Sequence, residues 1–243
     1  MSELWPEFFS SQPFGLALTV GAYALVVSVA RRLGGPAWLN PVLWSVGLIV
    51  AILLLARIDY ADYMRGGGIV TAFLGPAVVA LAVPLHQNRA QIRRALPGAL
   101  AAVGIGSLAG IIATVVLARL FGASPATILA VAPKHATSPV ALAVSELAGG
   151  PGELAAVIAI LTGILGAAVG PWLLRVMRID DERHRGLAIG VSSHAIGTAR
   201  ALEEGPVAGS FSVVGMVLAV VAVTLLVPMV LGAVPAVTTW LGL

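Results

Sequence analysis

The stretch Leu129-Ala-Val-Ala-Pro-Lys-His-Ala-Thr-Ser-Pro-Val-Ala-Leu-Ala-Val144 contains Lys134, the only lysine of the chain. About ten mostly apolar residues on each side are enough to form a short helix before and after it. Pro133 and Pro139 bracket the polar residues, and proline removes a backbone donor and breaks helices. The stretch therefore predicts an apolar helix that is interrupted at its centre, where a lysine, a histidine and two hydroxyl groups meet.

The composition of the whole chain predicts an integral membrane protein. Of its 243 residues, 59% are hydrophobic and only 10% are charged, and the mean hydropathy is +1.01. Soluble domains have about 25% charged residues. Runs of about 20 apolar residues, long enough to cross a bilayer, recur along the chain. We expect one all-α domain, residues 1–243, in the cytoplasmic (inner) membrane, with eight apolar elements at about 2–30, 38–57, 60–88, 96–121, 124–149, 153–175, 185–205 and 208–232.

Several classes of protein are excluded by the same composition. The first apolar run follows acidic residues instead of a basic segment, so we expect no cleaved signal peptide. The net charge of +3 comes from arginines at segment ends, which is typical of membrane anchors and not of nucleic-acid binding. There is no cysteine, and the four histidines lack metal-ligand spacing, so no metal or cofactor is expected.

A weak internal repeat divides the chain into two halves, at about 1–121 and 122–243. When the sequence is shifted by 122 to 126 positions, 11–19 aligns with 137–145, and Gly75 aligns with Gly197. The matches fall on the interrupted stretches, which is typical of transporters built from two inverted repeats whose broken helices meet near the membrane midplane. The alternative is a chance match between helices rich in alanine, glycine and leucine.

The arginine-rich gaps predict how the chain crosses the membrane. Cytoplasmic loops carry an excess of arginine and lysine. The gaps at 31–32, 89–94 and 175–185 hold most arginines, and they share one side if the fifth element enters and leaves on the same face as a pair of half-helices. We then expect three full crossings after it, by 153–175, 185–205 and 208–232, with both termini in the cytoplasm.

Lys134 is the first candidate binding residue, because no carboxylate lies within one helical turn of it in sequence. A substrate anion would be its natural counter-ion, His135 could donate a second hydrogen bond or carry a proton, and Thr137 and Ser138 could bind an anion at the start of a half-helix. The alternative is that Lys134 reaches the lipid headgroups and that a hydroxyl only caps the helix.

His194 is the second candidate, with Ser193, Gly197 and Thr198 around it and Gly75 as the repeat counterpart of Gly197. Hydroxyl groups and glycines allow polar contacts and a close approach of the backbone. The alternative is a packed histidine that is satisfied by a hydrogen bond. The small residues Gly104, Gly106 and Gly110 are expected only to pack helices.

Five motifs in register give the chain a resemblance to the LrgB/CidB family over nearly its whole length. They are Leu74–Leu85, Ala132–Ala141, Gly149–Pro151, Thr162–Gly166 and Ser193–Ala199. The family has two descriptions: a holin-like or antiholin-like protein that modulates murein hydrolase activity and autolysis, and a carrier of small carboxylates related to the plastidial glycolate/glycerate translocator. The family pattern has serine after the lysine, whereas this chain has His135, which puts substrate identity and proton coupling in question.

Two hypotheses follow from the residues and the resemblance together. The first is a secondary transporter of a monocarboxylate such as glycolate, glycerate, lactate or pyruvate, in which Lys134 holds the carboxylate. The second is a holin-like or antiholin-like regulator, which needs no small-molecule site. An enzyme is not expected, because no carboxylate orients His194 beside the serines. The resemblance also implies a small LrgA/CidA-type membrane partner, and we expect a homo-oligomer.

Overall fold

The computed structural model describes residues 11–34, 39 and 41–232, and the regular elements of these residues are all helices. The predicted all-α class is therefore confirmed. Five segments of the described chain are long and apolar enough to cross a membrane: Gln12–Arg32, Tyr60–Gln87, Arg89–Leu120, Gly152–Val176 and Pro206–Leu231. These segments make the protein an integral membrane protein, as its composition predicts. The chain forms two compact units, Met1–Val83 and Pro84–Leu243, and each is described separately.

The first unit contains α2 (Gln12–Arg32), α3 (Pro41–Ala56), α4 (Tyr60–Gly67), the 3₁₀ helix η1 (Gly68–Phe73) and α5 (Leu74–Ala80), and α6 (Ala82–Gln87) begins at its end. Helix α2 crosses α4 with their backbones in contact, because glycine stands on both sides: a Cβ atom on Gly15 or Gly66 would overlap the backbone of the other helix. The hydroxyl groups of Thr19 and Tyr63 join the same crossing, with their oxygens 2.8 Å apart.

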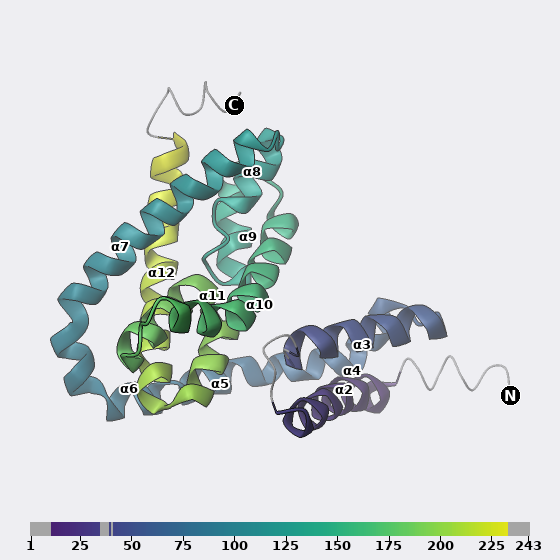
Figure 1. Cartoon of the computed structure of the whole chain (residues 1–243). Coiled ribbons are helices and arrows are strands. Elements are labelled where there is room, and N and C mark those ends of the chain that lie inside the picture. The colour runs from purple at the N-terminus through teal and green to yellow at the C-terminus, as the bar shows by residue number, and fades with distance from the viewer. Residues whose placement is uncertain (1–10, 35–38, 40, 233–243) are drawn as a thin grey trace, which may run out of the picture. The chain divides into compact units, whose positions relative to one another are not determined.

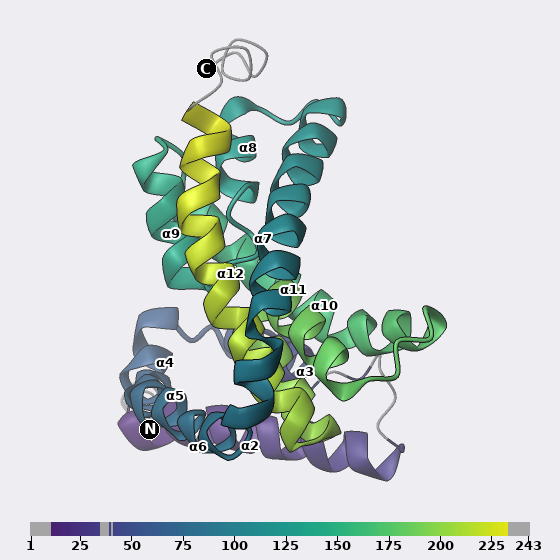
Figure 2. The ribbon, with the colours of Figure 1, turned by 90° about the vertical axis from the view of Figure 1, so that its left-hand side faces the viewer.

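The second unit is built from α7 (Arg89–Leu120), α8 (Pro125–Val131), α9 (Ser138–Leu147), α10 (Gly152–Val176), α11 (Glu182–Glu204) and α12 (Pro206–Gly232). The long helices α7 and α12 run in the same direction (Figures 1 and 2). Aliphatic side chains of both helices meet α8 and α9 in one buried cluster, which includes Ile111, Ile128, Val144 and Val223. Burial of this apolar surface holds α8 and α9 against the two long helices.

Helices α8 and α9 fold back on each other and form what we call the first hairpin, residues 125–147. Gly150, just past the end of α9, lies beside Leu129 of α8, and a Cβ atom on Gly150 would be 2.6 Å from the Leu129 Cβ. Such proximity requires the two helices to run in opposite directions. The turn, Ala132–Thr137, is the tip of this hairpin, and the predicted interruption at Pro133–Pro139 is observed there.

Helix α11 also folds back on itself, at His194, and forms what we call the second hairpin. His194 has φ 41° and ψ −129°, which is not helical. The side chains of Arg185 and Glu204 form an ion pair with a 2.8 Å Nη2–Oε2 distance. A straight helix would hold these two residues about 28 Å apart, at 1.5 Å per residue. The prediction that 185–205 crosses the membrane is therefore wrong, because the chain reverses at one residue in the middle of the segment.

The second hairpin packs tightly on α12 through small residues. A Cβ atom on Gly186 would overlap the carbonyl of Ala208, and one on Gly190 would overlap the carbonyl of Ser212. The residue numbers of these contacting pairs increase along both helices, so the first half of α11 runs parallel to α12. Because the glycines of α11 have no side chain and face small residues of α12, the two backbones approach each other closely, as in membrane helix pairs with small residues at the interface.

The two hairpins enter the second unit from opposite ends of α10. The first hairpin ends directly before Gly152, where α10 begins, whereas the second follows the end of α10 at Val176. Ala130 at the end of α8 packs on Ala155 and Ala159, and His194 at the second tip bonds to Ala159. The two tips therefore meet on the same part of α10 (Figure 1).

Candidate functional site

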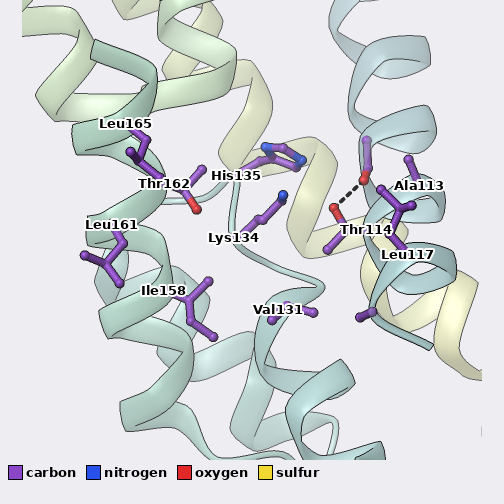
Figure 3. A pocket seen from close by; sticks show the side chains of 12 residues that line it. Ala113, Thr114, Leu117, Val131, Lys134, His135, Ile158, Leu161, Thr162 and Leu165 are labelled. Carbon is purple, nitrogen blue, oxygen red and sulfur yellow. Dashed lines mark hydrogen bonds between the residues drawn. The ribbon is translucent and has the colours of Figure 1, made fainter. Parts of the chain in front are cut away.

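A cavity of about 520 Å³ lies between α7, α10 and the tip of the first hairpin. Figure 3 shows Lys134 and His135 in its interior, with α10 on one side and α7 on the other. The walls are mostly aliphatic, and the remaining polar groups are two threonines. The lining residues are Gly110, Ala113, Thr114, Leu117, Ala118, Val131, Lys134, His135, Ile158, Leu161, Thr162 and Leu165. The volume lies within the roughly 300–1,000 Å³ range of small-molecule pockets.

Lys134 projects its amine into this cavity and is partly buried. Within the described residues its amine makes no ion pair and no hydrogen bond to the protein, since the four ion pairs there involve arginines only. Glu146, the nearest carboxylate in sequence on the hairpin, packs instead beside Gly152 at the hairpin's base. An ammonium group in an apolar wall without a counter-ion is costly, and such groups in membrane proteins mark substrate or ion pathways.

His135 lies beside Lys134 and packs on α7 at Gly110. A Cβ atom on Gly110 would be 2.8 Å from Nε2 of His135, so glycine at this position makes room for the ring. Both ring nitrogens are buried and have no hydrogen-bond partner of ordinary geometry in the described structure. Buried polar atoms are nearly always paired in folded proteins, so these two nitrogens at a cavity wall make His135 a candidate for contact with a bound molecule.

Of the pocket residues that were not sequence-based candidates, Gly110, Thr114 and Thr162 bear most directly on its chemistry. Gly110 was expected only to pack helices, and it instead contacts His135. Thr114 lies one turn further along α7 and donates its hydroxyl to the Gly110 carbonyl at 2.7 Å (Figure 3). Thr162 projects into the pocket from α10. A polar residue on an otherwise aliphatic helix face was the available signal for Thr114 and Thr162.

The second tip is satisfied by its own surroundings. His194 is buried, and its Nε2 atom lies 2.9 Å from the carbonyl oxygen of Ala159 on α10. Thr198 donates to the His194 carbonyl at 2.8 Å and its hydroxyl oxygen lies 2.9 Å from that of Ser212. Glycines of α10 receive this tip, because a Cβ atom on Gly163 would contact the His194 ring. This geometry is the packed, hydrogen-bonded alternative for His194.

The predicted candidates are therefore separated into groups. Lys134 and His135 line the cavity, whereas Thr137 and Ser138 begin α9 and are not among its lining residues. Ser193 and Gly197 lie with His194 and Thr198 inside the second hairpin and are buried between α10 and α12. Gly75 lies in α5 of the first unit.

Both hairpins nevertheless pack on Ala159 of α10, the first through Ala130 and the second through His194. The outer end of the second hairpin is held by the Arg185–Glu204 ion pair and by the Asp181 side chain, which accepts a 2.9 Å hydrogen bond from the Arg183 backbone. The hydrogen bonds from Arg183 also hold the pKa of the Asp181 carboxyl well below its usual range.

As a chemical arrangement, the pocket combines one cation, one imidazole and two hydroxyl groups with aliphatic walls. It can hold a small anion that also has an apolar part. Within the described residues no group of three or more histidine or acidic side chains could hold a metal ion.

Comparisons with known proteins agree with the resemblance found in the sequence. The model of the LrgB-like family matches residues 19–233. YxaC of Bacillus subtilis is 38% identical over 85% of this chain and 89% of its own length, and YwbG of the same organism is 36% identical over 85% and 91%. The holin-like protein CidB of Staphylococcus epidermidis is 33% identical over 89% of this chain and 94% of its own length. No solved structure matches the chain.

Proposed function

Since the chain belongs to the LrgB-like family and is an integral membrane protein related to holin-like proteins, we propose that it is a secondary transporter of small monocarboxylates. Glycolate, glycerate, lactate and pyruvate represent the class. The observation that carries the proposal is the amine of Lys134, which faces a cavity of about 520 Å³ without a protein counter-ion. A carboxylate in the cavity neutralises this amine, and the aliphatic walls contact the short carbon chain of the substrate.

The arrangement of the hairpins supports a transporter in particular. Two helical hairpins that enter from opposite ends and meet at their tips give a site that can be closed from either side. Transporters place substrate at such breaks, where backbone that is not helical lines a cavity and not the lipid. Here the unpaired lysine lies at one break, and the second break packs on the same part of α10 as the first hairpin does.

The arginines suggest which end of the second unit faces the cytoplasm. Arg89, Arg93 and Arg94 begin α7, and Arg175, Arg178, Arg183 and Arg185 lie around the end of α10 and the start of α11. Arg119 is the one arginine near the opposite end of the described helices of this unit. The excess belongs on the cytoplasmic side, so the second hairpin enters from the cytoplasm and the first from the other face of the inner membrane.

Counterflow in liposomes tests the proposal directly. Purified protein is reconstituted into liposomes that contain unlabelled glycolate, lactate or pyruvate, and the entry of the labelled acid is followed at equal pH on both sides. We expect Lys134→Ala to lower the rate about 100-fold or more, because the substrate then lacks its charged partner. Arg200→Ala removes an exposed cation and is expected to keep the wild-type rate. Unchanged counterflow in Lys134→Ala would remove this lysine from the mechanism.

A regulator of murein hydrolase activity and autolysis is the second candidate, and the name of the CidB relatives favours it. This function needs no substrate at Lys134. Wild-type protein that moves none of the acids in liposomes, together with a change in cell autolysis that is the same for wild type and Lys134→Ala, would favour the regulator. The small LrgA/CidA-type partner and the homo-oligomer belong to either candidate and are tested by co-purification from the membrane.

A further inference from the structure

His135 is the feature of the pocket that the proposed function does not use. Its two ring nitrogens are buried without partners, it stands next to Lys134, and it lines the same cavity. A histidine that only filled space would place at least one nitrogen on a protein or solvent partner, as His194 does with Ala159. The unpaired ring therefore calls for a functional explanation.

The charged groups around His135 are few. Lys134 directly precedes it on the same turn, and His194 on α11 contacts Ala159, which also packs on Ala130 of the first hairpin. Helix α7 presents the backbone of Gly110, α10 presents only aliphatic residues and Thr162 in the pocket, and α12 contains no ionisable residue. Within the described structure, every titratable neighbour of His135 is thus a potential cation. An imidazolium at His135 would stand next to the Lys134 ammonium, and two like charges at such a short distance repel each other.

A bound carboxylate reverses this balance. One anion in the cavity neutralises Lys134 and is close enough to accept a hydrogen bond from a protonated imidazole. Binding of the anion and binding of the proton then favour each other, and linkage makes the effect equal in both directions.

Resting on the proposed function, we infer that His135 couples carboxylate transport to protons: one proton binds the imidazole as one carboxylate binds Lys134, and both cross together. The proton comes from water on the side of entry and returns to water on the side of release. The transported pair carries no net charge. A serine at this position, as in the family pattern, offers a hydroxyl that does not titrate near neutral pH, so the coupling is specific to chains with histidine here.

The test compares wild type with His135→Ser and His135→Gln in liposomes, with His184→Ser as a matched control on an exposed histidine. Protein-free liposomes give the passive entry of each acid, which is subtracted. Counterflow at equal pH measures substrate movement without a proton gradient. Uptake with the outside one pH unit more acidic measures coupling, and a pH-sensitive dye inside the liposomes reports proton entry.

We expect wild type and His184→Ser to accumulate lactate or pyruvate up to about tenfold under this gradient, with acidification inside, since one pH unit for one proton corresponds to a factor of ten. We expect His135→Ser and His135→Gln to lower accumulation and acidification to the level of protein-free liposomes, and to lower counterflow by a smaller factor, because Lys134 still binds the carboxylate. Coupling that persists in both variants overturns the role of His135, as does wild-type counterflow without proton entry. If the wild type shows no counterflow at all, the proposed function itself fails, and the coupling fails with it.

Discussion

At the first tip, six residues from Ala132 to Thr137 separate the two helices, and the polar side chains of Lys134 and His135 have no protein partner in the described structure. At the second tip the chain reverses at His194 alone, and the imidazole, the backbone carbonyl and the neighbouring hydroxyl groups all have partners. Both tips contain a histidine at similar depth on α10. The difference is that the His194 ring is hydrogen-bonded to the protein, whereas the His135 ring has no protein partner among the residues that the structure describes.

This comparison assigns different roles to two hairpins of the same kind. A tip that is fully paired is rigid and specifies one packing, because breaking its bonds leaves buried groups unsatisfied. A tip with unpaired polar groups is less stable than a fully paired one, which is expected where a substrate supplies the missing partners. Under the proposed function, the second hairpin is the scaffold and the first carries the binding groups.

The largest effect is expected where the scaffold is tightest. Gly190→Val places a side chain into the carbonyl of Ser212, and because backbone cannot move aside as a side chain can, we expect a loss of about 3 kcal/mol or more of folding stability. Gly106→Val is the matched control, since a Cβ atom there has no neighbour within 4 Å. The stability of both variants is measured by thermal unfolding in detergent, with size-exclusion chromatography as the readout of folded protein. Equal midpoints for the two variants would contradict the rigid scaffold.

The sequence predicted where the two helices are interrupted better than it predicted whether the chain reverses there. Pro133 and Pro139 break the first hairpin by a local rule, so its tip could be found in the sequence. The second hairpin reverses at a histidine with positive φ, which has no glycine or proline signal, and the segment was therefore expected to cross the membrane. The charged residues at both ends of 182–204 were the available sign that these ends lie on one side.

The pocket was predicted only in part, for a different physical reason. Lys134 and His135 are adjacent in sequence and polar in an apolar run, which marks them. Gly110 and Thr162 join them from α7 and α10 through packing between elements that are far apart in sequence. A pattern within one helix gives no information on which face meets the tip of another element, so these contacts needed the structure.

Effects of intermediate size on folding stability are expected when one cation is removed from each hairpin, and the two effects should have opposite signs. Lys134→Met removes an uncompensated charge from a largely apolar pocket, and we expect a gain of about 1–2 kcal/mol in folding stability together with loss of transport. Arg185→Met leaves Glu204 without its partner in a site where both side chains are less than 20% exposed, and we expect a loss of about 1–3 kcal/mol. Thermal unfolding of the two purified variants is compared with that of wild type. Destabilisation by Lys134→Met would show that this lysine has a structural partner.

The smallest effect is expected at the helix starts of the two hairpins. Asp181 caps α11 through the Arg183 backbone, whereas Thr137 stands before α9 without a side-chain cap hydrogen bond. We expect Asp181→Ala to cost about 1 kcal/mol, and Thr137→Ala to cost almost nothing, because only the first loses a bond. Because the pKa of Asp181 is lowered in the folded protein, its contribution is present at neutral pH and is lost as the pH falls below the ordinary aspartate pKa of about 3.9 toward the lower folded value. Thermal unfolding is therefore measured from pH 7 to pH 3. The difference in stability between wild type and Asp181→Ala should shrink only at the acidic end, while Thr137→Ala follows wild type throughout. A clear loss of stability in Thr137→Ala at neutral pH would mean that the Thr137 side chain caps α9, so that the first tip is less free for a ligand than its unpaired nitrogens indicate.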